Sequence, residues 1–199
     1  AEYTVSVKSI ARHFGALFIA VCIIASLGCA RSATLPKNAS AEEMYKAAVY
    51  DMKRGLHPEA LKAFERIRAR YPYSPFAPLS DLRIADCHFE SGRHLEAIEG
   101  YRTFMQFHPR HPEAAYAAYR IGEAHMKRAP RDWLIMPPAY EKDLSAVRQG
   151  VIVLQEFVKA HSGSTYEKEG RALLKKGMTR LGEHELYVSR FYYKRKKYK

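Results

Sequence analysis

Apolar residues recur with the period of an α-helix in the stretch that follows Gly55. Ala60, Phe64 and Ile67 are spaced at i, i+4 and i+7, and charged residues stand among the positions between them. This spacing places the three apolar side chains on one face of a helix. The pattern therefore predicts an amphipathic helix from about Pro58 to Tyr71.

The same pattern returns 37 positions further along, because residues 92–109 align with residues 55–72 without a gap. The aligned pairs are Gly55 with Gly92, His57 with His94, Glu59 with Glu96, Ala60 with Ala97, Leu61 with Ile98, Phe64 with Tyr101, and Pro72 with Pro109. Self-similarity at a fixed period of about 20–50 residues indicates a repeat array. A small residue, an aromatic residue four positions later and a closing proline are typical of the second helix of a tetratricopeptide unit of about 34 residues.

Glycine and proline positions predict that each unit is a helical hairpin. Gly55 and Gly92 can end the first helix, because glycine accepts the left-handed backbone conformation that a helix end often needs. Pro58 suits the first turn of the next helix, and Pro72 and Pro109 end that helix because the residue before a proline is disfavoured in helical conformation. We therefore expect an all-α fold, a tetratricopeptide-like α-solenoid of antiparallel helical hairpins.

The pattern divides residues 40–199 into successive units. We expect repeats at 40–74, 76–111 and 112–163, an insertion at 129–142 and a partial repeat at 181–199, with helices at 40–54, 58–71, 79–90, 95–108, 144–160 and 165–180. Ser40 with Glu43, and Ser164 with Glu167, have the spacing of a capping box, which satisfies backbone N–H groups at a helix start. Cys87 falls within a predicted helix, where we expect a small buried residue rather than a reactive thiol.

The first 29 residues differ in kind from the repeats. Lys8 and Arg12 precede the nearly apolar stretch 14–27, which has the length of the apolar region of a signal peptide. That stretch is shorter than the ~20 residues of a membrane-spanning helix. Gly28 and Cys29 follow it, and a small residue before a cysteine at this place resembles the lipobox of bacterial lipoproteins.

The lipobox resemblance implies that residues 1–28 are a lipoprotein signal peptide and 29–39 a lipid-anchored tether. Cys29 would carry a diacylglycerol and an N-acyl chain, and more than one chain gives stable membrane attachment. Ser26 stands where an aliphatic residue is usual, so a plain signal peptide or an uncleaved anchor is the alternative. The absence of an aspartate just after Cys29 favours the outer membrane, by the same resemblance.

The sequence contains none of the common catalytic or metal-binding motifs that follow. His184 and Glu185 are not followed by the second histidine of the metalloprotease helix motif. His108 and His111 lack the partner ligands of a zinc site, and there is no glycine-rich phosphate loop or nucleophile elbow. We therefore expect a protein that is not an enzyme and that binds no cofactor apart from the acyl chains on Cys29.

Positive charge gathers towards the C-terminal end. The formal net charge of the chain is +12, and lysines and arginines outnumber acidic residues most strongly between 171 and 199. A basic patch often indicates nucleic acid. For an exported protein we expect acidic partner surfaces or anionic lipids instead, and a merely solvated helix face is the alternative.

Three segments together resemble one protein family. They are YPYSPFAP at 71–78, the proline-interrupted insertion at 129–142, and EHELYVSRFYYKR at 183–195. These segments are similar to those of the BamD (ComL or YfiO-type) lipoproteins of the outer-membrane β-barrel assembly machine. In that family the last segment resembles the first helix of a fourth repeat, in which Tyr187, Phe191 and Tyr192 would be packing aromatics. By this resemblance about one and a half hairpins of the family pattern would follow Lys199.

The resemblance implies a function and its residues. The protein would sit on the periplasmic face of the outer membrane of a Gram-negative bacterium and promote the insertion of barrel proteins. Its partners would be unfolded outer-membrane proteins, the periplasmic domains of the barrel-forming subunit and other Bam lipoproteins. The peptide-binding groove would use Tyr45, Met52, Tyr73, Phe76, Phe89, Tyr116 and Tyr119, and partner docking would use Trp133, Arg190, Lys194 and Arg195.

Two alternatives stay open at the level of the sequence. The loop that carries Trp133 could be a partner surface or could fold back into the groove. A periplasmic tetratricopeptide scaffold that binds peptidoglycan or a Tol-Pal-like complex would share the export signal and the repeats. A solute-binding protein is not expected, because the chain has no series of strand patterns.

Overall fold

The first hairpin begins with the capping box that the sequence predicts. In this computed structural model, which describes residues 38–130 and 141–196, helix α2 spans Ala41–Lys53 and Ser40 is its N-cap. The Ser40 hydroxyl accepts from the Glu43 N–H at 3.2 Å, and the Glu43 carboxylate accepts from the Ser40 N–H at 2.8 Å. The two side chains thus satisfy two backbone donors that have no partner within the helix.

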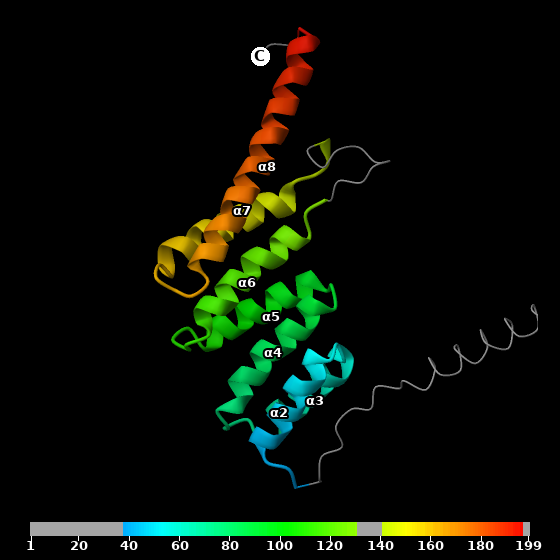
Figure 1. Ribbon diagram of the computed structural model, residues 1–199, viewed down its shortest axis with the longest axis vertical. Helices are drawn as coiled ribbons and strands as arrows, with labels where there is room; N and C mark the ends of the chain where they lie inside the picture. Colours follow the sequence, from blue (N-terminus) through cyan, green and yellow to red (C-terminus); the bar gives the residue numbers. More distant parts are fainter. Residues whose placement is uncertain (1–37, 131–140, 197–199) are drawn as a thin grey trace, which may run out of the picture. The chain divides into compact units, whose positions relative to one another are not determined.

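The described residues contain seven helices, each packed against the next. After α2 come α3 (His57–Arg70), α4 (Phe76–Glu90), α5 (His94–Phe107), α6 (Ala114–Lys127), α7 (Ser145–Ala160) and α8 (Glu167–Lys194). Helix α2 also contacts α4, and α6 also contacts α8, so the first helices of neighbouring hairpins meet (Figure 1). This arrangement confirms the predicted all-α stack of tetratricopeptide-like hairpins.

The turns inside the first two hairpins also follow the prediction. Gly55 and Gly92 have φ values of +79° and +77°, the left-handed region that favours glycine. Pro58 lies in the first turn of α3. Helix α4 begins at Phe76, three residues before the predicted start at Leu79, because the Ser74 hydroxyl accepts from the Phe76 N–H at 3.2 Å.

The core is divided into three clusters along the stack. The first joins α2, α3 and α4 around Met44, Phe64 and Ile67, and it includes Cys87. The second lies between α4, α5 and α6, with Leu82, Tyr101 and Phe104 among its members. The third contains residues of α6 and α7, such as Met126 and Leu154. Successive small cores are typical of repeat proteins, in which each unit contacts only its neighbours.

Cys87 confirms its predicted role as a buried packing residue. Its side chain lies wholly inside the first cluster. Burial raises the pKa of the thiol to about 12, with a smaller contribution from the neighbouring Asp86. Since the thiolate is the reactive form of cysteine, this side chain is chemically inert at neutral pH.

The prediction for the last helix was wrong about its start and its continuity. Helix α8 begins at Glu167 with Tyr166 as N-cap, so Ser164 and Glu167 do not form a capping box; the Glu167 carboxylate instead accepts from the Gly163 N–H. One helix of 28 residues then replaces the predicted segment 165–180 and the separate unit that begins at 181. Gly182 does not interrupt it, because this glycine has no positive φ.

The end of the predicted tether that lies among the described residues belongs to the folded repeats. Ala39 is buried in the first core cluster, and its carbonyl oxygen accepts from the Tyr71 hydroxyl at 2.7 Å. Cys29 and Trp133 lie outside the described residues. Of the helices that are described, none is long and apolar enough to cross a membrane.

Candidate functional site

A buried carboxylate links α4, α5 and α6. Asp86 on α4 is only 4% exposed. It accepts from the Tyr101 hydroxyl at 2.6 Å and from the Tyr116 hydroxyl at 2.9 Å, and it forms an ion pair with Arg83 one turn earlier. A buried charge is costly unless it is paired and hydrogen-bonded, and these three donors meet that need.

Arg120 on α6 extends the same network towards the surface. Its guanidinium donates to the Tyr101 hydroxyl at 3.2 Å, to Glu123 at 3.1 Å and to Glu90 at 2.8 Å. The guanidinium also lies over the Phe89 ring, 3.6 Å from its centroid, a favourable cation–π position. The charged residues thus join two successive repeats in a single network.

The pKa values of the network follow from its burial and its charges. Burial raises the pKa of Tyr101 and of Tyr116, and Asp86 raises both further. Burial alone would lower the pKa of Arg83, but the interactions with Asp86 and Tyr45 together outweigh it and raise the pKa. At neutral pH the two hydroxyls therefore remain donors and the guanidinium remains charged.

Sequence reasoning missed the two arginines, although the repeat itself carried a signal. Arg83 and Arg120 are separated by the repeat period of 37, and so are Asp86 and Glu123. Each arginine pairs with the acidic residue three positions later in its own helix. Comparing the repeats at their charged positions, as well as at their apolar ones, would have found this pattern.

The structure brings some of the predicted groove residues together in the first repeat. The rings of Tyr45 and Phe76 lie 5.3 Å apart, centroid to centroid. The Tyr45 hydroxyl accepts from Arg83 at 3.3 Å, which ties this pair to the buried network. Met52 packs against the same core cluster as Tyr45 and Phe76, and all three are partly exposed.

The remaining groove residues have different surroundings. Tyr119 stacks on Tyr166 with centroids 5.6 Å apart, and Tyr116 lies 5.2 Å from the same ring. Phe89 is only 6% exposed, so little of its ring is left for a ligand. Tyr73 is fully exposed, in the turn between α3 and α4. The structure thus forms two aromatic groups, one around Tyr45 and one around Tyr119.

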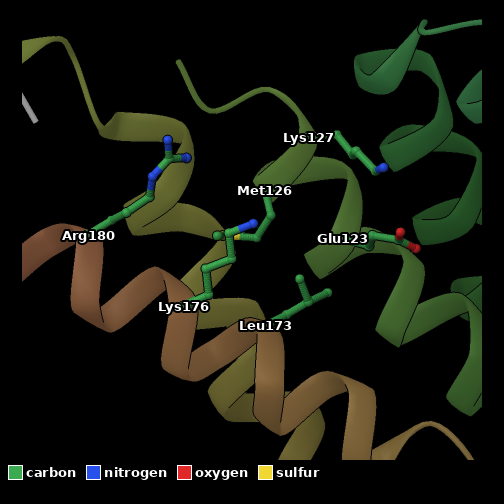
Figure 2. Close-up of a pocket in the computed structure, with 6 residues that line it drawn as sticks. All are labelled: Glu123, Met126, Lys127, Leu173, Lys176 and Arg180. Atoms are coloured by element: carbon green, nitrogen blue, oxygen red, sulfur yellow. The ribbon is translucent and has the colours of Figure 1, made fainter. Parts of the chain in front are cut away.

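A pocket of about 180 Å³ lies between α6 and α8. Its lining residues are Glu123, Met126 and Lys127 from α6, and Leu173, Lys176 and Arg180 from α8 (Figure 2). Figure 2 shows the Lys176 side chain directed across the gap towards Met126, whereas the Arg180 side chain extends away from Leu173. An Arg180 N–H donates to the Pro130 carbonyl oxygen at 2.9 Å, where α6 leads into the insertion.

Three of the predicted docking residues, Arg190, Lys194 and Arg195, lie on the last turns of α8 and at its C-cap, where no residue is buried. Arg190, Lys194 and Arg195 are exposed, and the Arg195 guanidinium lies 4.0 Å from the Phe191 ring centroid. Phe191 and Tyr192 are 36% and 50% exposed, so they do not serve as packing aromatics among the described residues. The reason is that α8 continues past the helices it contacts, α6 and α7 (Figure 1).

The arrangement is suited to binding. Within residues 38–130 and 141–196 no group of three His, Cys, Asp or Glu side chains could hold a metal ion. The surface of the described residues has partly exposed aromatic groups, a pocket lined by lysine and arginine side chains, and an exposed basic helix end. Aromatic and methionine side chains on a repeat surface suit extended peptides of varied sequence.

Comparison with known proteins identifies a family model and solved structures that are similar to the chain. Residues 37–199 match the family model YfiO, described as outer membrane lipoprotein. No curated protein matches the chain. A solved structure of a kinesin light chain with nearly identical TPR-like repeats from Podosopora anserina is similar at a TM-score of 0.53 and 15% identity, covering 78% of this chain and 74% of that one.

A second solved structure, the Sgt2 TPR domain from Aspergillus fumigatus, is 18% identical at a TM-score of 0.47 and covers 79% of this chain and 87% of that one. The kinesin light chain supports the tetratricopeptide-like fold alone, because its identity is low. The family match is more specific, since it spans every described helix. The chain therefore belongs to the YfiO family of outer membrane lipoproteins.

Proposed function

We propose that this lipoprotein is a non-enzymatic component of the outer-membrane β-barrel assembly machine. The aromatic groups of the first three repeats bind unfolded barrel proteins, and the exposed end of α8 docks the periplasmic domains of the barrel-forming subunit. The observation that carries the proposal is the family match, which spans residues 37–199. Binding without catalysis agrees with a repeat fold whose described side chains offer a surface for peptides.

The two functions separate along the chain. Tyr45, Phe76 and Tyr119 are partly exposed aromatics on the first helices of successive hairpins or at their start. They are suited to apolar side chains of an extended segment. Arg190 and Lys194 stand on exposed positions of α8 beside exposed aromatic rings, a composition common at protein interfaces.

Co-purification tests the proposed assembly role. The tagged full chain, solubilised from its own membranes in detergent, is expected to recover a large outer-membrane barrel protein with periplasmic repeat domains. Arg190→Glu combined with Lys194→Glu should reduce that recovery at least about tenfold, because charge reversal places like charges against an acidic partner surface. Recovery of peptidoglycan fragments or Tol-Pal-like proteins in place of the barrel protein would overturn the assignment.

Matched variants test the groove. Tyr119→Glu should weaken photo-crosslinking to C-terminal segments of barrel proteins, since it buries a charge where an apolar side chain would bind. Tyr50→Glu is the control, because Tyr50 is an exposed tyrosine outside the predicted groove. Equal crosslinking by both variants, at equal thermal stability, would move the peptide site elsewhere.

A further inference from the structure

The pocket between α6 and α8 has chemistry that the aromatic groups lack. We infer that it binds an acidic side chain, aspartate or glutamate, of an extended peptide in which an apolar residue lies next to the acidic one. The inference rests on the proposed peptide-binding function and adds a selectivity to it. Three features of the pocket carry it: its charge, its apolar wall and its size.

Cationic side chains outnumber acidic ones around the pocket. Lys127, Lys176 and Arg180 stand against the single carboxylate of Glu123. That carboxylate is already bound to Arg120 at 3.1 Å. Among the described residues, neither Lys127 nor Lys176 has an ion pair. Lys127 on α6 and Lys176 on α8 therefore bring positive charge to the pocket that no acidic side chain of the described residues neutralises.

The repeat register shows that this charge is particular to the third repeat. Lys127 stands 37 positions after Glu90, the equivalent position of the second repeat. Glu90 is paired with Arg120 at 2.8 Å. The change from Glu90 to Lys127 therefore reverses the charge at the end of the first helix, and it does so where α8 contributes Lys176 and Arg180.

The wall between the charges is apolar. Met126 is nearly buried and belongs to the third core cluster, and the partly buried Leu173 packs against that cluster. Methionine and leucine beside mobile ammonium groups suit a ligand that is apolar at one point and anionic at the next. An acidic side chain beside an apolar one in an extended chain has this form.

The size of the pocket favours a side chain over a larger anionic ligand. Its volume of about 180 Å³ is below the roughly 300–1,000 Å³ of sites for small molecules. The lysine ammonium groups are single point charges on flexible stems. Arg180 already donates to the Pro130 carbonyl oxygen. A single carboxylate therefore matches the positive charge available in the pocket better than a multiply charged group does.

Fluorescence anisotropy with defined peptides tests the inference. The probe is a fluorescein-labelled peptide with an amidated C-terminus and an aspartate between two phenylalanines in a Gly-Ser background, added to the full chain in detergent. Its asparagine counterpart should bind about tenfold more weakly, because a charge-assisted hydrogen bond is lost. Raising the salt concentration should reduce that difference.

Matched variants assign the effect to the pocket. Lys127→Gln with Lys176→Gln should abolish the preference for aspartate over asparagine. Lys175→Gln is the control, since Lys175 is an exposed lysine of the same helix that does not line the pocket. All three lysines are exposed, so unchanged thermal melting of the variants is expected and is checked by circular dichroism.

Several results would overturn the inference. The unaltered chain could bind the aspartate and asparagine peptides equally, or bind neither. The Lys175→Gln control could lose the preference for aspartate. Binding could also occur only with an asparagine peptide that has a free C-terminal carboxylate. Each leaves the proposed function standing if the barrel subunit still co-purifies. If the barrel subunit does not co-purify with the unaltered chain, the proposed function itself is rejected.

Discussion

Asp86 shows how one residue can hold two repeats together. Its carboxylate accepts from hydroxyl groups on α5 and α6 as well as from an arginine of its own helix. The donors stand 15 and 30 positions away in sequence, so no local pattern indicates that they meet. Such a network stabilises the fold when complete and is costly when one member is lost.

Replacing Asp86 tests the charge of the network. Asp86→Asn should lower the free energy of unfolding by about 3–5 kcal/mol, because it leaves buried arginine charge without its counter-ion. Tyr116→Phe, which removes a single hydrogen bond to the same carboxylate, should cost about 1 kcal/mol. Denaturant unfolding of both variants measures the difference. Equal losses would mean that the negative charge contributes nothing beyond one hydrogen bond.

At the scale of elements, α8 is held to α7 through two close contacts at glycine. An added Cβ at Gly170 would lie 2.5 Å from the Phe157 ring, and one at Gly177 would lie 2.6 Å from a Val151 methyl group. Both glycines are buried, whereas no residue of α8 after Gly177 is. The absence of a side chain at these positions therefore sets how closely the two helices approach.

Two glycine variants of α8 separate packing from helix propensity. Gly177→Ala should destabilise the protein by about 1–3 kcal/mol, since the new methyl group overpacks the contact with Val151. Gly182→Ala, which meets nothing within 4 Å, should raise stability by up to about 1 kcal/mol, because alanine favours the helix. Thermal unfolding followed by far-UV circular dichroism measures both. Stabilisation by both substitutions would show that α7 and α8 are not closely packed at Gly177.

The elements also show what the sequence could and could not predict. Helix starts and ends with local signals, such as the capping box at Ser40 and the left-handed turns at Gly55 and Gly92, were predicted closely. The continuity of α8 was not predicted, because the similarity of the segment from 181 to the start of a repeat indicated a new helix there. The buried network and the pocket were missed, because their members come from helices far apart in sequence.

At the scale of the whole molecule, the chain combines a repeat stack with a predicted anchor. Cys29→Ser should release the protein from membranes into the soluble periplasmic fraction, because acyl chains on Cys29 would be the main attachment. Fractionation followed by immunoblotting measures this, with Cys87→Ser as the control cysteine. Unchanged membrane association of Cys29→Ser would reject lipid anchoring at that residue.

The continuous helix α8 has a mechanical consequence. From Leu181, the last residue of α8 that packs against the third core cluster, to Lys194 the helix runs about 20 Å at 1.5 Å per residue. A straight helix of that length is a lever arm whose pivot lies where Arg180 and Leu181 still contact the stack. A tilt imposed at the exposed end would act first on Arg180, which lines the pocket and donates to the Pro130 carbonyl oxygen. We therefore expect a partner bound at the end of α8 to change the position of Arg180 and with it the shape of the pocket.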